Sequence, residues 1–341
     1  MVPLNDRPEQ QEQTLAGKAV VVTGGAGFIG SQLVERLVRD GARVRAFVQY
    51  NPNSDRDNLE LAPADVQRGV EVVFGDLRDP WRVATALEGQ EVVFHLGALI
   101  SIPYSYQAPA DYIATNVLGT LNVLEGARAA GAARVVHTST SEVYGSAQSV
   151  PIDEEHRLHA QSPYAASKIG ADQLAQSYRL SFDVPVTTIR PFNTYGPRQS
   201  ARALVPTIIT QALHEPEIVL GSLTPTRDLT FVEDTVDAFV RVALAPDAVG
   251  RTLNVGTGTE ISVGDLVETI LGITGRPVPV RQDPARIRPE SSEVVQLVCD
   301  ASAIAQVAGW KPRVPLEDGL RQTVAWIERH PGRYRPAEYL V

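Results

Sequence analysis

The sequence predicts an α/β protein built on a doubly wound parallel sheet, with a smaller α/β part toward the C-terminus. Short β-branched runs alternate with amphipathic helical segments up to about Phe192, as expected for parallel strands joined by crossover helices. A glycine-rich turn separates the first predicted strand from the first predicted helix. Beyond Phe192 the segments become shorter and less regular, which indicates a second part with a different architecture.

The composition is that of an ordinary globular protein. Of the 341 residues, 43% are hydrophobic and 21% charged, and the net charge of −9 argues against nucleic acid as a partner. Cys299 is the single cysteine and six histidines are scattered, so we expect no disulfide and no metal site. No apolar run reaches the ~20 residues of a membrane helix, and residues 1–17 are polar. We therefore expect a cytoplasmic enzyme that does not bind membranes and has a flexible N-terminus.

The glycine-rich turn predicts a dinucleotide-binding site. Lys18 to Thr23 has the pattern of a buried strand, and Ser31 to Asp40 that of an amphipathic helix ending at Gly41. Between them, Thr-Gly-x-x-Gly-x-x-Gly lets the backbone approach a pyrophosphate at the helix N-terminus. Three glycines alone would also suit a plain loop, but the flanking strand and helix favour a Rossmann-type domain over residues 18–192. The residues expected at the cofactor are Gly24, Gly27, Phe28, Ile29 and Gly30.

The end of the second predicted strand, Arg43 to Val48, leaves the cofactor open between NAD and NADP. An acidic residue at this place normally binds the adenosine ribose of NAD, and here the position holds Val48. Asn51, Ser54 and Arg56 follow and are candidates for holding the ribose phosphate of NADP.

Later elements add further candidate cofactor contacts. Val70 to Phe74 and Glu91 to Leu96 are predicted strands, and residues 111–130 are a predicted helix. Asp76 follows the first of these strands and is expected beside the adenine, or alternatively as a helix cap before Pro80. The asparagine inside the helix has either a backbone-bonding role or a solvated position. The candidate contacts are Asp76, Leu77, Leu96, Ala98 and Asn116.

The stretch of residues 137–168 carries the predicted chemistry. A buried strand, Arg134 to Thr138, ends in a loop that contains Thr140 and Glu142, and loops at strand ends hold the reactive groups of open α/β sheets. Ser162-Pro163 then predicts the start of a helix that extends to Leu180.

Tyr164 and Lys168 lie four residues apart on one face of that helix. A tyrosine that acts as a base near neutral pH needs its pKa of ~10 lowered by about three units, or roughly 4 kcal/mol. One cation at ~4 Å and an effective dielectric of ~20 supplies about that much. A surface lysine one turn after a tyrosine is the alternative interpretation. The chain has only Lys18, Lys168 and Lys311 among its 31 basic residues, which favours a specific role for Lys168.

Turn-rich and arginine-bearing loops follow the sixth predicted strand, Pro185 to Arg190. Arginines presented singly from loops suit a diphosphate, although each is also a candidate for a surface salt bridge. They include Arg202, Arg227, Arg286 and Arg288.

In combination, these motifs resemble the extended short-chain dehydrogenase/reductase family that modifies nucleotide sugars. The likeness runs from about Lys18 to Ile327. It rests on segments 23–30, 76–77, 190–197 and 226–234 together with Asn116, Thr140 and the Tyr164/Lys168 pair. The resemblance implies a tightly bound, recycled NAD or NADP in the core. It also implies a sugar nucleotide held mainly by residues 193–341, of which some elements return to the core, and a homodimer formed through helices 111–130 and 162–181. By matching position, the residues at the nucleotide or diphosphate would be Asn193, Arg227 and Arg288, with Arg202 as a further candidate.

The order Thr140-Ser141-Glu142 resembles the 4,6-dehydratases of this family, whereas its epimerases generally lack the glutamate. In such an enzyme, oxidation at carbon 4 of the sugar acidifies the proton on carbon 5. Glu142 would remove that proton while water leaves from carbon 6, and hydride then returns to carbon 6. Tyr164 would be the base for the oxidation, Thr140 would bond the same hydroxyl, and Lys168 would tune Tyr164 and bind the nicotinamide ribose. The expected product is a nucleotide-linked 4-keto-6-deoxy sugar.

Several alternatives stay open within this resemblance. Ser141 stands where dTDP-glucose dehydratases have aspartate, so the leaving water would be protonated by Glu142 or through a relay. Segments 102–106, 161–169 and 197–202 look most like dehydratases of nucleotide-linked N-acetylglucosamine in legionaminic-acid-type pathways, but the nucleobase and sugar are not determined. A 4-epimerase and a UDP-glucuronate decarboxylase fit the same site. An NAD(P)-sensing binding protein is the non-enzyme alternative, although a pure binder needs no base.

Overall fold

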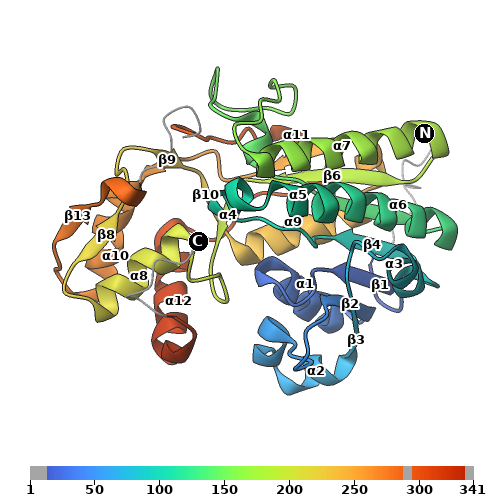
Figure 1. The fold of residues 1–341 in the computed structure, drawn as a ribbon, viewed down its shortest axis with the longest axis horizontal. Coiled ribbons are helices and arrows are strands. Elements are labelled where there is room, and N and C mark those ends of the chain that lie inside the picture. The colour runs from blue at the N-terminus through green and yellow to red at the C-terminus, as the bar shows by residue number, and fades with distance from the viewer. Residues whose placement is uncertain (1–13, 287–293, 335–341) are drawn as a thin grey trace, which may run out of the picture.

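The computed structural model describes residues 14–286 and 294–334. Its centre is a seven-stranded sheet in which every neighbouring pair runs parallel, in the order β11-β6-β5-β4-β1-β2-β3 (Figure 1). The order reverses between β1 and β4, which places a crevice for a ligand at the carboxyl ends of these two strands. The strands are β1 (Ala19–Thr23), β2 (Arg43–Gln49), β3 (Val70–Gly75), β4 (Val92–His95), β5 (Arg134–Thr138), β6 (Val186–Pro191) and β11 (Thr252–Val255).

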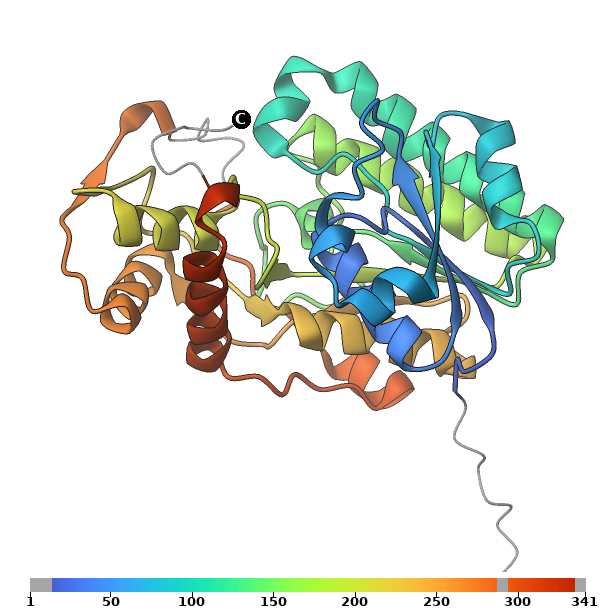
Figure 2. The ribbon, with the colours of Figure 1, turned by 90° about the horizontal axis from the view of Figure 1, so that it is seen from below.

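Helices cover both faces of this sheet (Figures 1 and 2). On one face α3 packs on α6 and α6 on α7, and on the other α9 packs on both α1 and α11. These six helices are α1 (Phe28–Arg39), α3 (Pro80–Leu87), α6 (Gly119–Ala130), α7 (Pro163–Phe182), α9 (Val232–Leu244) and α11 (Ser302–Ala308). Shorter helices on the loops are η1 (Asp57–Leu61), α2 (Ala64–Gly69), α4 (Ile102–Gln107) and η3 (Ser141–Tyr144). The predicted doubly wound parallel fold is confirmed.

The six predicted strands lie within one residue of their observed bounds, because each is a short β-branched run. The seventh, β11, has the sequence Thr-Leu-Asn-Val and comes from the part of the chain beyond the predicted core boundary. The first helix begins at Phe28, earlier than expected, since the glycine turn continues directly into it. At the N-terminus, Leu15 is buried and the amide of Gly17 donates to the carbonyl of Gly41. Packing of the chain therefore begins before Lys18.

The predicted helix at 111–130 is three consecutive pieces rather than one. It consists of α5 (Pro109–Tyr112), a π-helical turn (Ile113–Leu118) and α6. A π-turn widens the backbone spacing and is often found at functional positions. Here it contains the buried Asn116, whose contacts are described below.

The C-terminal part lies beside the sheet (Figure 2) and contains three longer helices and several two-stranded sheets. The helices are α8 (Leu204–His214), α10 (Val263–Thr274) and α12 (Leu316–Arg329). The small strands are β7 (Asn193–Tyr195), β8 (Ile218–Leu220), β9 (Thr226–Arg227), β10 (Leu229–Phe231), β12 (Ile261–Ser262) and β13 (Val280–Gln282). Single 3-10 turns are η4 (Pro246–Ala248), η5 (Pro284–Arg286) and η7 (Pro331–Arg333).

One apolar cluster joins the two parts of the molecule. It includes Val20 and Leu33 from the sheet and α1, and it continues without a break to Ile208 and Leu320 in α8 and α12. A buried ion pair crosses the same boundary: Arg198 Nη2 lies 2.7 Å from Glu35 Oε2 on α1. The C-terminal part is therefore fastened to the helix that follows the glycine turn.

No helix within residues 14–286 and 294–334 is both long and apolar enough to cross a membrane.

Candidate active site

The glycine turn forms a tightly packed cradle at the ends of β1 and β4. A Cβ atom on Gly30 would lie 2.1 Å from the carbonyl oxygen of Gly24, and one on Gly24 would lie 2.8 Å from the Cα of Gly97. Gly27 is the N-cap of α1 and makes no side-chain cap to the first-turn amides. Because those amides and the helix dipole favour an anion, this geometry fits the pyrophosphate of a dinucleotide. Phe28 and Ile29, the other two predicted contacts, form the first turn of α1.

The neighbouring strand ends supply the other predicted cofactor contacts. Leu77 follows β3, and its side chain lies so close to Gly97 that a Cβ atom added to this glycine would be 2.8 Å away. Leu96 and Ala98, on either side of Gly97, therefore lie where the loops after β3 and β4 are in contact. Asp76 accepts from the Arg78 guanidinium, which lowers the pKa of that carboxyl. The alternative reading of Asp76 as the helix cap is wrong. The cap of α3 is Asp79, which accepts from the amides of Trp81 and Arg82.

Asn116 binds other residues of the chain through its side-chain amide. Its Oδ1 accepts from the Leu99 amide at 2.8 Å, and its Nδ2 donates to the Leu99 carbonyl and to Ser167 Oγ at 2.9 Å each. These bonds hold the loop after β4 against α7. The backbone-bonding role is confirmed, and the solvated alternative is wrong because Asn116 is 1% exposed.

The segment after β2 offers polar groups in place of an acidic one. Val48 is buried, and Asn51 uses its side chain to close a loop with both backbone groups of Asp55. Ser54 has a φ of +53°, and Arg56 is exposed. In the structure the Asn51 side chain is thus engaged within the loop, whereas Ser54 and Arg56 are exposed.

Helix α7 carries the predicted tyrosine and lysine at its N-terminal end. Ser162 caps the helix by accepting from the Ala165 amide at 3.1 Å, and Pro163 occupies its first turn. Both features were predicted, because they satisfy or remove amides that have no partner in a first turn. Tyr164 and Lys168 are 6% and 4% exposed. The interpretation of Lys168 as a surface lysine is therefore wrong.

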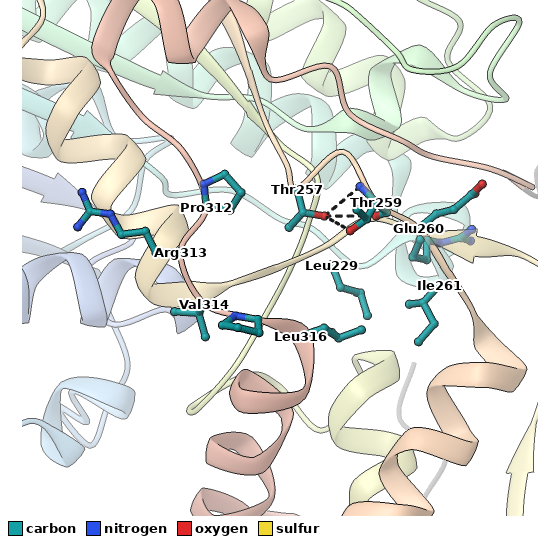
Figure 3. Close-up of a pocket in the computed structure, with 11 residues that line it drawn as sticks. Leu229, Thr257, Thr259, Glu260, Ile261, Pro312, Arg313, Val314 and Leu316 are labelled. Carbon is teal, nitrogen blue, oxygen red and sulfur yellow. Dashed lines mark hydrogen bonds between the residues drawn. The ribbon is translucent and has the colours of Figure 1, made fainter.

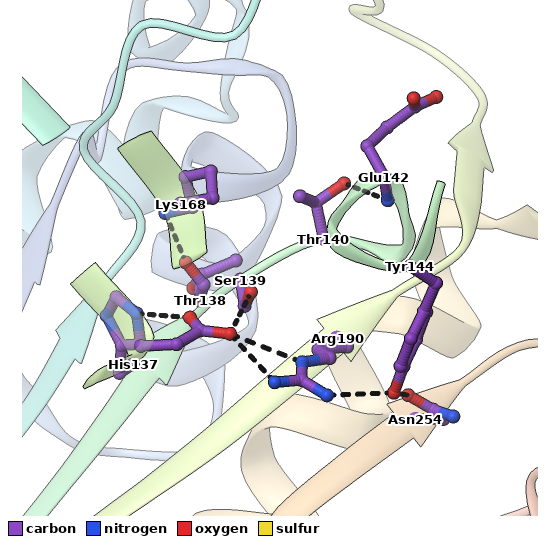
Figure 4. Close-up of polar contacts among 10 residues, drawn as sticks. His137, Thr138, Ser139, Thr140, Glu142, Tyr144, Lys168, Arg190 and Asn254 are labelled. Atoms are coloured by element: carbon purple, nitrogen blue, oxygen red, sulfur yellow. Dashed lines mark hydrogen bonds and ion pairs between the residues drawn. The ribbon is translucent and has the colours of Figure 1, made fainter. Parts of the chain in front are cut away.

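Glu142 lies on η3, a single turn of 3-10 helix shortly after β5, and Thr140 is the N-cap residue of that turn. Thr140 Oγ1 accepts from the Glu142 amide at 3.2 Å and also forms a side-chain hydrogen bond with Tyr164. Figure 4 shows the Glu142 side chain extending from this turn away from Arg190 and Asn254. Burial is the main cause that raises the pKa of the Tyr164 phenol, and the negative charge of Glu142 raises it further. The structure thus brings the hydroxyl, the carboxylate and the phenol together.

The electrostatics of the chain differ from the expectation for the tyrosine. Burial raises the pKa of Tyr164, against the opposing effect of the Thr140 hydrogen bond. Burial also lowers the pKa of Lys168 to about 8, and the charge of Asp172 opposes that change. The expected lowering of the Tyr164 pKa by Lys168 is not found in the chain by itself, because burial is the largest influence on that pKa. The Lys168 ammonium donates instead to the Thr138 carbonyl at 2.6 Å.

A buried polar cluster that was not predicted lies next to the loop that carries Thr140 and Glu142. Asp172, one turn beyond Lys168 on α7, accepts from His137 Nε2 at 3.1 Å, from Ser139 Oγ at 2.8 Å and from Arg190 Nη2 at 3.0 Å (Figure 4). Arg190 continues the cluster to the Tyr144 hydroxyl at 2.9 Å. The signal that could have revealed Asp172 is its spacing, since residues 164, 168 and 172 recur every fourth position of one helix.

The predicted substrate residues are spread over the C-terminal part. Asn193 is on β7, and among the described residues its Oδ1 is buried without a hydrogen-bond partner, which suits a ligand contact. Arg227 on β9 donates to the carbonyls of Thr226 and Val294 at 2.8 Å. Arg202 is exposed, and its charge acts on Tyr112 beside Tyr164. Arg288 lies outside the described residues.

A pocket of about 330 Å³ lies in the C-terminal part, next to Arg227 (Figure 3). Its other walls come from the loop after β11 and the segment before α12. None of Thr140, Glu142, Tyr164 and Lys168 lines it, so the pocket is separate from these four residues. The lining residues are Arg227, Leu229, Thr257, Thr259, Glu260, Ile261, Pro312, Arg313, Val314, Pro315 and Leu316.

Comparison with known proteins shows the family. The family model described as GDP-mannose 4,6 dehydratase matches residues 21–323. The chain belongs to this family. The predicted membership of the extended short-chain dehydrogenase/reductase proteins that act on nucleotide sugars is thereby confirmed.

Members of the dehydratase family with different activities resemble the chain over nearly its whole length. It is 37% identical to a UDP-glucose 4-epimerase of Mycolicibacterium smegmatis, over 90% of this chain and 97% of that protein. It is 31% identical to a dTDP-glucose 4,6-dehydratase of an Actinoplanes species, over 90% and 97% of the two chains. The crystal structure of a dTDP-glucose 4,6-dehydratase of Streptomyces venezuelae, which holds NAD, matches with a TM-score of 0.85 and 31% identity. That match covers 94% of this chain and 99% of the other. The chain is therefore an enzyme of a family that contains both dehydratases and epimerases.

Proposed function

We propose that the protein is a nucleotide-sugar 4,6-dehydratase. The observation that carries the proposal is the turn η3, which places the Glu142 carboxylate two residues after Thr140 with its charge acting on Tyr164. A dehydratase needs two bases at one sugar ring, one for the hydroxyl on carbon 4 and one for the proton on carbon 5. A phenol and a carboxylate at the same site supply both.

The chain is built to hold NAD or NADP. The cradle formed by Gly24, Gly27 and Gly30 has the close backbone packing that a pyrophosphate needs, and the solved dehydratase of Streptomyces venezuelae holds NAD. Hydride acceptance from carbon 4 and hydride return to carbon 6 are the chemistry that a bound nicotinamide supplies. Lys168 lies buried one helical turn from Tyr164, where its ammonium can bind the ribose next to that ring.

The proton transfers fall to residues of the chain. Tyr164 accepts the proton of the carbon 4 hydroxyl, and Thr140 bonds that same hydroxyl. Glu142 accepts the proton of carbon 5, which the adjacent ketone makes acidic, and passes it to the hydroxyl leaving carbon 6, so that water departs. Ser141 is 2% exposed, which favours Glu142 itself over a relay through Ser141. Carbon 5 then receives a proton from solvent, Tyr164 releases to solvent the proton that it took from the carbon 4 hydroxyl, and the 4-keto-6-deoxy product is complete.

The substrate is proposed to be a nucleoside diphosphate hexose, with N-acetylglucosamine as the first sugar to test. The unpartnered Oδ1 of Asn193 and the cation of Arg227 are the described groups offered to the nucleotide or diphosphate, and Arg202 and Arg288 are further candidates. Residues 193–341 are proposed to form most of this binding region, on a core that spans residues 18–192.

A homodimer is proposed through the helical segments 111–130 and 162–181. Large apolar side chains are exposed along the helices that would form the interface, including Ile113 at 48%, Leu118 at 50% and Leu180 at 77%. Apolar groups at such exposure favour a partner surface.

A 4-epimerase is the second candidate, favoured by the 37% identity to the epimerase of Mycolicibacterium smegmatis. An epimerase also oxidises carbon 4 with Tyr164 and Thr140, but it returns hydride to carbon 4 and leaves the 6-hydroxyl in place. It has no chemical use for Glu142 as a base.

Incubation with a panel of nucleotide sugars and NAD, followed by mass spectrometry, tests the proposal. Loss of one water from the substrate supports the dehydratase. A product of unchanged mass but altered chromatographic retention identifies an epimerase, and loss of carbon dioxide from a uronate identifies a decarboxylase. Either of the last two results would overturn the proposal.

A further inference from the structure

Three successive turns of α7 bind the end of β5 and the loop that follows it, residues 139–144, which we call the reactive loop because it carries Thr140 and Glu142. The first turn does so through Tyr164, which bonds Thr140, and the second through Lys168, which bonds the Thr138 carbonyl. The third does so through Asp172, which bonds both His137 and Ser139. The side chains on one face of α7 therefore bond four consecutive residues, His137 to Thr140, at and just after the end of β5.

Asp172 is the most connected of these anchors. Its Oδ1 accepts from His137, and its Oδ2 accepts from Ser139 Oγ and from two nitrogens of Arg190, Nη2 at 3.0 Å and Nε at 3.3 Å. Asp172, His137, Ser139 and Arg190 are each at most 5% exposed. A carboxylate so deeply buried is tolerated only when hydrogen bonds and a cation compensate for its lost hydration.

The bonds of Asp172 extend beyond α7 to the far side of the loop. Arg190 at the end of β6 donates to the Tyr144 hydroxyl at 2.9 Å, and that hydroxyl donates to Asn254 Oδ1 on β11 at 2.8 Å (Figure 4). Tyr144 closes the turn η3 on which Glu142 lies. Asp172 is thus connected to both ends of the reactive loop, through Ser139 before Thr140 and through Tyr144 after Glu142.

We propose that Asp172 is a positioning residue, which fixes the loop bearing Thr140 and Glu142 against Tyr164 and supplies the negative charge that keeps the buried Lys168 ammonium protonated. The inference rests on the proposed function in one respect: Tyr164 is taken as the base for the oxidation and Lys168 as its cationic neighbour. It adds a role for a residue that touches neither sugar nor cofactor in that scheme.

The charges around Lys168 support the second half of this role. Burial lowers the pKa of Lys168 to about 8, and the Asp172 carboxylate is the group that opposes the change. From the adjoining strands β4 and β5, His95 and His137 face it, and burial lowers the pKa of each, so both are neutral at neutral pH. Arg190 on β6 is cationic, and Tyr164 on α7 is an uncharged phenol. Asp172 is therefore the acidic side chain in this group that retains its negative charge.

The test measures the protonation of Lys168 directly. The chain contains three lysines, so labelling lysine with carbon-13 at Cε gives three resolvable signals, assigned with K18R and K311R. We expect Asp172→Asn to lower the titration midpoint of Lys168 by about one pH unit or more, as for the loss of an opposite charge one helical turn away. Asp183→Asn, the same change at the exposed C-cap of α7, should leave the midpoint unchanged.

Two further variants separate the charge from the geometry. Asp172→Glu retains the charge and should retain the Lys168 midpoint. Ser139→Ala retains the charge but removes one bond to the loop, so it should lower kcat at least tenfold with the midpoint unchanged. If D172N fails to fold, the titrations of the wild type and D172E test the charge, and the kcat of S139A tests the positioning. A wild-type midpoint below neutral pH would mean that Asp172 does not keep Lys168 charged.

An unchanged Lys168 midpoint in folded D172N would overturn the electrostatic role, and full activity of S139A would overturn the positioning role. The lysine titration uses no sugar substrate. A protein that makes no dehydrated product from any nucleotide sugar but shows the D172N shift would thus contradict the proposed function and still support this inference.

Discussion

The ammonium nitrogen of Lys168 donates a 2.6 Å hydrogen bond to the carbonyl oxygen of Thr138. Thr138 is the last residue of β5, and the reactive loop begins immediately after it. The bond therefore ties α7, which bears Tyr164, to the strand that leads into the loop with Thr140 and Glu142. It also keeps a cation inside the protein, where burial disfavours charge.

Stability should depend on pH through this lysine. The folded pKa of Lys168 is about 8, below the ~10.4 of an unfolded lysine. Between these values the unfolded chain binds a proton that the folded chain does not, so stability rises with pH across that window. The gain is on the order of 3 kcal/mol. Urea unfolding from pH 7 to pH 10 should show it in the wild type and in the exposed-site control Lys311→Met, but not in Lys168→Met. A parallel pH dependence in all three proteins would contradict this prediction.

Glu142→Gln should abolish dehydration while cofactor binding is retained. The amide cannot accept the carbon 5 proton, and loss of a general base costs about 10²–10⁴-fold in rate. Mass spectrometry of the products and cofactor titration by fluorescence give the two readouts. Glu155→Gln changes an exposed glutamate close in sequence and should be fully active. If E142Q makes the 4-keto-6-deoxy product at the wild-type rate, Glu142 is not the base.

Tyr164→Phe should stop the first oxidation. The substitution removes the phenol that accepts the carbon 4 proton and its bond to Thr140. We expect a fall in kcat of about 10²–10⁴-fold, measured as reduction of bound cofactor on mixing with substrate. Tyr178→Phe alters another buried tyrosine of α7, whose hydroxyl bonds Glu125. It should reduce stability rather than kcat, and equal kcat losses in the two variants would argue against a special role for Tyr164.

The cap of α7 should affect both stability and activity. Ser162→Ala removes the bond to the Ala165 amide and should cost about 1 kcal/mol of unfolding free energy. Ser262→Ala removes the equivalent cap of α10 and should cost a similar amount. Only S162A should also reduce kcat, because Tyr164 lies in the turn that it caps. Equal activity in the two variants would show that the cap does not position Tyr164.

Two glycine substitutions should have opposite effects. Gly30→Ala places a methyl group 2.1 Å from the Gly24 carbonyl, so the turn must open and cofactor binding should be lost. Gly272→Ala, in α10, meets no atom within 4 Å and should stabilise the protein by up to about 1 kcal/mol. Calorimetric titration with NAD measures the cofactor affinity of both variants, and thermal unfolding measures their stability. Wild-type cofactor affinity in G30A would refute the proposed cradle.

The sequence was sufficient for six of the seven strands of the central sheet and for the start of α7, because their signals are local. β-branched runs mark the six strands, and Ser162-Pro163 marks the start of the helix. The strand β11 is only four residues long, and its place in the sheet follows from pairing with β6, a contact between distant parts of the chain. The π-turn around Asn116 has an ordinary helical sequence, so its widened backbone could not be predicted from helix propensity.

Tertiary contacts decide the parts of the site that were missed. The pKa of Tyr164 depends on how deeply the phenol is buried, which spacing on a helix does not reveal. Asp172 shares the four-residue spacing of Tyr164 and Lys168, but its partners His137 and Arg190 come from two other strands. The four-residue spacing indicates which face of α7 carries Asp172. The partners of Asp172 become visible only when the helix is packed on the sheet.

The ion pair between Arg198 and Glu35 links the segment after β7 to α1. A hinge motion that separated these two elements would have to break the pair, although Glu35 would keep its second partner, Arg39, at 2.7 Å. Relative movement that keeps α1 and this segment together therefore costs less than movement that parts them.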